Sequence, residues 1–140
     1  MTVLAFIIAI YTLPMLLIHV STAKILEAWG GAGSSRIQQQ FPPRRALRVE
    51  ALYWLLALAA WPVWRAAGWK ALVVLFAAIH IGVWLSNEFG KVELSGANAR
   101  RPAHSARLNR AIIAFDLVEA AMLAAIGILS VLYLVHSLRP

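Results

Sequence analysis

Four long apolar stretches constrain this chain more than any other feature of its sequence. The first, residues 1–23, contains no Asp, Glu, Lys or Arg. At about 1.5 Å per helical residue it is long enough to cross a hydrocarbon core of roughly 30 Å. A secretory signal peptide is the alternative interpretation, but no basic segment precedes the apolar run. We therefore expect a retained transmembrane helix here.

The other three stretches carry few charges. Residues 51–64 are short for a span and become long enough only if the flanking arginines extend to the interfaces. Gly68 and Lys70 mark a tight turn before the third stretch. We predict a single domain with helices over about 3–23, 49–67, 70–87 and 111–136.

Composition agrees with a membrane protein. The chain is 61% hydrophobic and only 14% charged, whereas soluble domains have roughly 45–50% apolar and about 25% charged residues. It has no cysteine, which excludes disulfides and thiolate metal sites. The fold class we predict is all-α, an integral membrane four-helix bundle with a tight hairpin between its second and third helices.

The distribution of basic residues predicts the orientation. The net charge is +7, and ten of the thirteen Lys and Arg residues lie in the two loops that follow the first and third apolar stretches. The positive-inside rule then makes both loops cytoplasmic and the topology N-out and C-out. Because the basic residues flank apolar stretches, we expect a lipid bilayer as partner and no nucleic acid. A bacterial inner membrane is the expected location.

Each predicted helix carries titratable or hydroxyl side chains in its cytoplasmic half. Counting from the helix ends at the same rise per residue, we expect His19 and Glu50 near the interface, and His80 about 10 Å into the core. The candidate ligand-binding residues are Arg48, Tyr53, His19 and Glu50, and the candidate catalytic residues are His80, Asp116 and Glu119.

Asp116 and Glu119 share one helix face, and a carboxylate at bilayer depth is costly unless it is paired or wetted. A proton-coupled site, a carboxylate and histidine metal site, and acid–base chemistry on a lipophilic substrate are the functional interpretations. Alternatively the fourth helix begins later than 111, and both acids pair with Arg107, Arg110 or Lys91 near the headgroups.

His80 has three functional interpretations and one structural interpretation. A single intramembrane imidazole can ligate haem iron, shuttle a proton or cap an acid of the fourth helix. A hydrogen bond to a neighbouring helix is the structural alternative. We expect His19 and His136 nearer opposite interfaces, which favours a five-coordinate haem or no haem. For a carboxylate metal centre, Glu50 and His80 are the expected partners of Asp116 and Glu119.

Tryptophans and alanines complete the pattern. The aromatic rings could line a pocket for a flat ligand, but we interpret most of them as interface anchors: Trp54, Trp61, Trp64, Trp69 and Trp84. Alanine-rich faces in the second and fourth helices indicate close packing in a tight bundle or an oligomer.

Short segments along the chain resemble the HemJ-type protoporphyrinogen oxidases, which are four-helix membrane proteins. They are residues 11–16 with His19 shortly after, 44–48, 68–70 with His80 ten residues on, and 104–107. The chain departs from that family at Met15, where the family has an arginine. The resemblance implies haem-linked oxidation, with His80 as the iron ligand.

A second resemblance is to the membrane-associated eicosanoid and glutathione metabolism proteins. Arg45-Ala46 with Tyr53 resembles the start of their second helix. This resemblance implies the same order of four helices and a cytoplasm-facing site.

Three functions follow as expectations. The first is a redox or ligand-handling module, an enzyme or not, for a lipophilic ring compound such as a porphyrin, haem or quinone. The second is a non-catalytic subunit of a larger membrane complex. The third is a small proton-coupled transporter working as a homo-oligomer, with Asp116 or Glu119 carrying the proton.

Overall fold

A computed structural model describes residues 1–25, 43–89 and 106–138 of the chain. These residues form four long α-helices, one short 3-10 helix and a helical segment over residues 22–25, which confirms the predicted all-α class for this part of the chain. The elements are α1 (Thr2–Val20), α4 (Pro43–Ala59), η1 (Trp61–Val63), α5 (Ala67–Glu88) and α6 (Ala106–Ser137).

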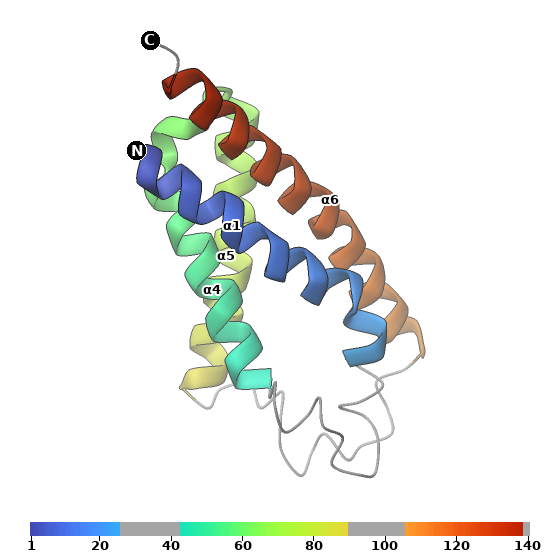
Figure 1. The fold of residues 1–140 in the computed structure, drawn as a ribbon. Helices are drawn as coiled ribbons and strands as arrows, with labels where there is room; N and C mark the ends of the chain where they lie inside the picture. The colour runs from blue at the N-terminus through green and yellow to red at the C-terminus, as the bar shows by residue number, and fades with distance from the viewer. Residues whose placement is uncertain (26–42, 90–105, 139–140) are drawn as a thin grey trace.

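The helices pack as two pairs. α1 lies along α6, and α4 lies along α5, while contacts of α1 with α4 and of α6 with η1 join the pairs. The two ends of the chain lie at one end of the molecule, and α4 begins and α5 ends at the opposite end (Figure 1). α1 and α6 slant relative to α4 and α5, so residues at different distances from their helix ends can meet at one level.

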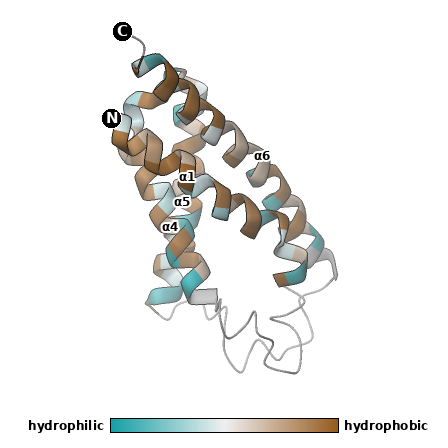
Figure 2. Cartoon of the chain, viewed as in Figure 1, coloured by the Kyte–Doolittle hydropathy of each residue, from teal (hydrophilic) through white to brown (hydrophobic). Residues whose placement is uncertain are grey.

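Three of the helices have the length and apolar character needed to cross a membrane. They are α1, α5 and residues 110–137 of α6, and apolar residues cover most of their length (Figure 2). On α1 one row of exposed apolar side chains, with Ile7 exposed beside it, recurs every three or four residues: Val3, Phe6, Ile10, Leu13, Leu17 and Val20. A helix that is apolar on its exposed face as well as its packed face is typical of a membrane span. The described chain therefore has the character of a membrane protein.

The second helix differs from its prediction because of Pro62. α4 ends at Ala59 rather than at residue 67, and the chain continues as the 3-10 turn Trp61–Val63. Pro62 has no amide hydrogen to donate and its ring clashes with the preceding turn, which favours ending α4 here, although α1 continues through Pro14. The predicted turn at Gly68 and Lys70 is also wrong, because both residues lie inside α5. The connection comes earlier in the chain, between Ala59 and Ala67.

The fourth helix begins earlier than predicted. α6 starts at Ala106 rather than at residue 111. Asp116 and Glu119 are therefore well inside the helix, and Glu119 is fully buried. The alternative in which a late helix start leaves both acids near the headgroups is therefore wrong for Glu119.

Thr12 of α1 makes close contacts with its pair partner α6 and with α4 of the other pair. A Cβ added to Gly127 of α6 would lie 3.0 Å from Thr12 Cγ2 of α1, so the two helices touch there. The Thr12 hydroxyl donates to the Ile8 carbonyl at 2.8 Å and lies 3.0 Å from the Tyr53 hydroxyl of α4.

The interface role predicted for Trp54 and Trp64 is wrong. The two indoles are 0% and 1% exposed, and Trp64 Nε1 donates to the Ala57 carbonyl at 2.7 Å. Trp61 fits an anchoring role better, since it is exposed and its ring lies 5.1 Å from Lys70 Nζ.

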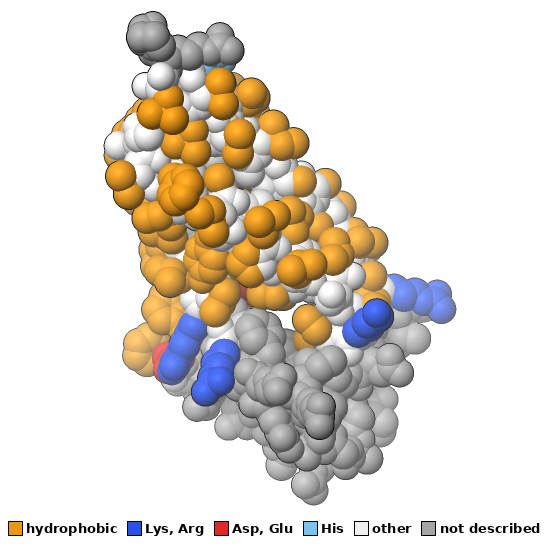
Figure 3. Space-filling view, in the orientation of Figure 1, with side chains coloured by type: hydrophobic (Ala, Val, Ile, Leu, Met, Phe, Trp, Pro, Cys, Tyr) orange, Lys and Arg blue, Asp and Glu red, His pale blue; other side chains and the backbone are white. Residues whose placement is uncertain are grey.

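Basic side chains gather at the end of the molecule opposite the termini (Figure 3). In the described segments, Lys24, Arg45, Arg48 and Arg110 lie at the helix ends on this side. Arg48 forms a bidentate ion pair with Glu88 of α5, in which Nη2 lies 2.5 Å from Oε1 and Nε lies 3.2 Å from Oε2. These hydrogen bonds raise the pKa of the Arg48 guanidinium. We call this end the basic end.

Candidate functional site

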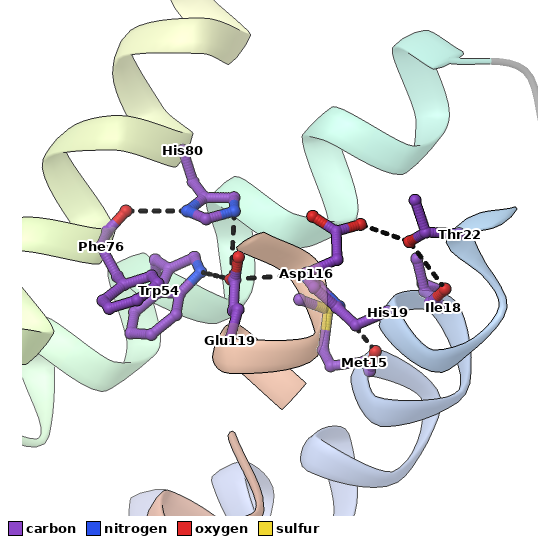
Figure 4. Close-up of polar contacts among 9 residues, drawn as sticks. All are labelled: Met15, Ile18, His19, Thr22, Trp54, Phe76, His80, Asp116 and Glu119. Atoms are coloured by element: carbon purple, nitrogen blue, oxygen red, sulfur yellow. Dashed lines mark hydrogen bonds and ion pairs between the residues drawn. The ribbon is translucent and has the colours of Figure 1, made fainter. Parts of the chain in front are cut away.

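One carboxylate oxygen is the centre of the site. Glu119 Oε1 lies 3.2 Å from His19 Nε2 and 3.1 Å from His80 Nε2, and Trp54 Nε1 donates to it at 3.2 Å (Figure 4). The four residues come from α6, α1, α5 and α4, so every α-helix contributes one side chain. All are buried. We call His19, His80 and Glu119 the His–Glu–His site.

Both imidazole rings are held by their own helices. His19 Nδ1 lies 2.8 Å from the Met15 carbonyl, and His80 Nδ1 lies 2.8 Å from the Phe76 carbonyl. A carbonyl oxygen only accepts hydrogen bonds, so each Nδ1 must carry the hydrogen and donate it. This contact fixes the tautomer and turns each Nε2 toward Glu119.

The donor and acceptor count at this point requires a positive partner. In a neutral ring with hydrogen on Nδ1, Nε2 presents a lone pair, and an ionised carboxylate oxygen presents lone pairs as well. His19, His80 and Glu119 therefore place three hydrogen-bond acceptors next to one another with no hydrogen between them. The place is buried, where unpaired polar groups are costly. Protons shared among the three groups, or a metal ion bound by all three, would remove this conflict.

The distances suit a small metal ion. The two nitrogens and a Glu119 oxygen lie within 4.8 Å of one another. Donors bound at about 2.0–2.1 Å stand roughly 2.8–3.0 Å apart around an octahedral ion and roughly 3.3–3.4 Å apart around a tetrahedral ion, and the two contacts at Glu119 Oε1 lie within this range. Imidazole and carboxylate are ligands that first-row divalent metals accept.

A stack of aromatic rings packs against one face of the His80 imidazole. The Trp54 ring stacks on His80 with centroids 5.6 Å apart, and Phe76 stacks on Trp54 at 5.4 Å. Phe115 of α6 extends the stack, 5.7 Å from Phe76. Packing of this kind limits rotation of the His80 ring and keeps the site dry on that side.

A second group of polar residues lies one helical turn closer to the basic end. Asp116 precedes Glu119 by three residues on α6, and the Thr22 hydroxyl donates a short hydrogen bond to it. Glu50 precedes Trp54 by four residues on α4 and interacts electrostatically with both histidines, Asp116 and Glu119. Both acids are half-buried. We call Glu50 and Asp116 the acidic layer.

The second oxygen of the central carboxyl, Glu119 Oε2, is buried without a hydrogen-bond partner among the described residues. Asp116 lies on the same face of α6, one turn away, because residues three apart in a helix are neighbours. The unpaired oxygen and the acidic layer therefore belong to one polar region.

The predicted site residues divide into two sets. The structure brings His19, Glu50, His80, Asp116 and Glu119 into this region, although their predicted roles stay predictions. Tyr53 points its hydroxyl at Thr12, and Arg48 pairs with Glu88 at the basic end, more than half exposed. Neither contacts Glu119 directly in the described segments.

The expected difference in level between His19 and His80 is wrong. His19 and His80 touch the same oxygen atom, with ring centroids 6.4 Å apart. Counting residues from the helix end placed His19 near the interface, but α1 slants across the bundle, so that count does not measure depth (Figure 1). A usable signal was present in the sequence, since Thr12 and His19 are seven residues apart and share the buried face of α1.

Trp54 is the site residue that sequence reasoning missed. An indole in a membrane protein is most often an interface anchor, so its hydrogen bond to a carboxylate of another helix has no local signature. Pairing of Trp54 with Glu119 depends on how α4 and α6 pack, which is a tertiary property.

Comparison with known proteins adds no relative. No protein-family model matches the chain, and no curated protein or solved structure matches it either. The resemblances to the HemJ-type oxidases and to the eicosanoid and glutathione proteins therefore stay predictions.

Haem does not fit the described side chains. A haem held by two histidines places its flat macrocycle between the imidazoles. Between His19 and His80 stands the Glu119 carboxyl instead, and the Trp54 ring covers the face of His80. The same packing argues against a haem on His80 alone, because its Nε2 points at Glu119.

Proposed function

We propose that this chain is a membrane metalloprotein that binds one divalent first-row transition-metal ion through His19 Nε2, His80 Nε2 and the Glu119 carboxylate. The observation that carries the proposal is the convergence of these atoms on a buried point, with both Nδ1 atoms tied to backbone carbonyls. Ligating histidines characteristically donate their second ring hydrogen to a carbonyl or a carboxylate.

The donor set suits a reactive ion better than a structural one. Structural zinc sites use four protein ligands, whereas catalytic sites use three and leave a position for water or substrate. Two histidines with one carboxylate form the donor set of zinc hydrolases and of non-haem iron oxygenases. The substrate is a separate prediction: a lipophilic ring compound, for which such a centre would act as a redox or ligand-handling module.

In the proposed membrane arrangement, α4 completes a four-helix bundle with the three apolar helices. The basic end faces the cytoplasm, and both chain ends lie outside, in keeping with the positive-inside rule. The His–Glu–His site then lies in the cytoplasmic half of a bacterial inner membrane.

A proton relay is the second candidate. Its support is the electrostatic interaction of Glu50 with His19, His80, Asp116 and Glu119, which forms a chain of proton-binding groups leading from the basic end. Protons would then occupy the positions that the first proposal gives to a metal ion, as a proton-coupled transporter requires.

Metal analysis distinguishes the two candidates. The full chain, purified in mild detergent, is incubated with Zn²⁺, Fe²⁺, Co²⁺ or Mn²⁺, desalted and analysed by plasma mass spectrometry. We expect one tightly held ion per chain in wild type and loss of that ion in His80→Gln and Glu119→Gln. His136→Gln is the matched control, since His136 is exposed on α6. Wild type without a bound ion would refute the metal proposal and leave the proton relay.

A further inference from the structure

The acidic layer lies between the basic end and the His–Glu–His site. Glu50 and Asp116 each lie about one turn closer to that end than Trp54 and Glu119 on the same helices, and Thr22 lies three residues after His19, just beyond the end of α1. Both acids are half-buried, whereas Glu119 is fully buried. The layer therefore separates the buried site from the surface.

Charge explains why such a layer is needed. Lys24, Arg45, Arg48 and Arg110 lie at the basic end, where Arg48 is paired with Glu88. The net positive charge of this end repels an approaching divalent cation. A negative charge along the route offsets this repulsion, and fields of this kind change association rates by roughly 10–1,000-fold. In the described segments, Glu50 and Asp116 are the acids that interact electrostatically with both histidines and with Glu119.

Thr22 holds Asp116 to one side. Its hydroxyl donates to Asp116 and also approaches the Ile18 carbonyl at 3.5 Å. Asp116 is thereby drawn toward α1 rather than toward the two Nε2 atoms (Figure 4). One turn deeper, the buried Glu119 Oε2 has no partner in the described residues and is available to receive a cation.

We propose that Asp116 and Glu50 are loading carboxylates, which capture a hydrated divalent cation at the basic end and pass it to the His–Glu–His site. This inference rests on the proposed metal-binding function. In the loaded protein, two histidines and Glu119 hold the ion, while Asp116 returns to Thr22. The loading carboxylates therefore govern how fast the ion arrives more than how many ions are held.

The test is a loading-rate measurement with Co²⁺, whose visible absorption reports its coordination. Full-length protein in detergent is stripped with a chelator and mixed with Co²⁺ in a stopped-flow instrument. The variants are Asp116→Asn and Glu50→Gln, each of which removes one charge, and Asp116→Glu, which retains it. Glu88→Gln is the matched control, because Glu88 is a carboxylate at the same end that pairs with Arg48.

We expect Asp116→Asn and Glu50→Gln to load about tenfold slower or more, while both still reach one ion per chain. Asp116→Glu is expected within about twofold of wild type. Glu88→Gln removes the partner of Arg48 and so adds repulsion at the basic end, and it is expected to slow loading less than either Asp116→Asn or Glu50→Gln. If Asp116→Asn does not fold, Glu50→Gln alone decides.

Two results would overturn the loading role. The first is an unchanged rate in both charge-removing variants. The second is loss of the ion at saturation in Asp116→Asn, which would make Asp116 a permanent ligand. Wild type that takes up no Co²⁺ is a different failure, because it refutes the metal site itself.

Discussion

Replacing Trp54 by phenylalanine removes one hydrogen bond to Glu119 while an aromatic ring stays in the stack. Trp54 is 0% exposed, and its Nε1 lies 3.2 Å from Glu119 Oε1. Without that donor, the two histidines are the remaining described contacts of the carboxyl. We expect the carboxyl to become free to rotate, so that Trp54→Phe weakens metal binding as well as folding.

The expected loss of stability depends on whether the acceptor of the lost hydrogen bond is charged or neutral. A hydrogen bond to a charged group contributes about 1.5–3 kcal/mol to stability, and one between neutral groups about 0.5–1.5 kcal/mol. Trp64→Phe is a matched control, because Trp64 is also buried but donates to the neutral carbonyl of Ala57. The loss of ring volume is the same in both variants, so Trp54→Phe should cost about 1–1.5 kcal/mol more in the free energy of unfolding.

Metal affinity separates the two variants more sharply. Removing a partner that orients a metal ligand typically lowers affinity about 10–100-fold, or roughly 1.4–2.7 kcal/mol. Competition titrations of Co²⁺ against a chelator measure this quantity, and chemical denaturation in detergent measures stability. Equal metal affinity of Trp54→Phe and wild type would refute the view that Trp54 positions Glu119, and so would an equal loss of affinity in Trp64→Phe.

Three further predictions concern packing, pH and the surface. Gly127→Leu should cost about 1–3 kcal/mol of stability, because its Cβ would meet Thr12 at 3.0 Å; Gly82→Leu, where nothing lies within 4 Å, should be neutral in the same denaturation assay. Metal affinity should fall as pH is lowered, because protons compete with the metal for Nε2 of both histidines, and a titration series that is independent of pH would contradict histidine ligation. Arg48→Ala should change stability by less than about 1 kcal/mol, because its pair with Glu88 is exposed, and a larger loss by denaturation would contradict this.

The apolar pattern was sufficient to predict the helices and their rough extent. Charge-free runs long enough to span a bilayer carry their signal locally, and α1, α5 and most of α6 lie where those runs are. The error lay at the second helix, where the search for a span of full length led the prediction through Pro62. Backbone chemistry at one proline outweighs the apolar character of its neighbours.

The candidate site was predictable in its residue types and not in its geometry. A carboxylate at bilayer depth needs a partner, which drew attention to Glu119 and His80, and the structure places these two side chains in contact. His19 and Trp54 complete the site because of the slant of α1 and the packing of α4 against α6. Neither of these tertiary features can be predicted from the local sequence. Helix tilt is set by packing against neighbouring helices, so residue counts from a helix end give only a coarse depth.

X-ray absorption at the metal edge of the Co²⁺-loaded protein tests the central claim most directly. The account predicts a shell of nitrogen and oxygen ligands at about 2.0–2.1 Å, with the outer-shell scattering of two imidazole rings. In His80→Gln, where one of these rings is lost, the bound Co²⁺ should disappear or show a single imidazole. A spectrum of oxygen ligands alone, with no imidazole signal in wild type, would contradict metal binding by His19 and His80.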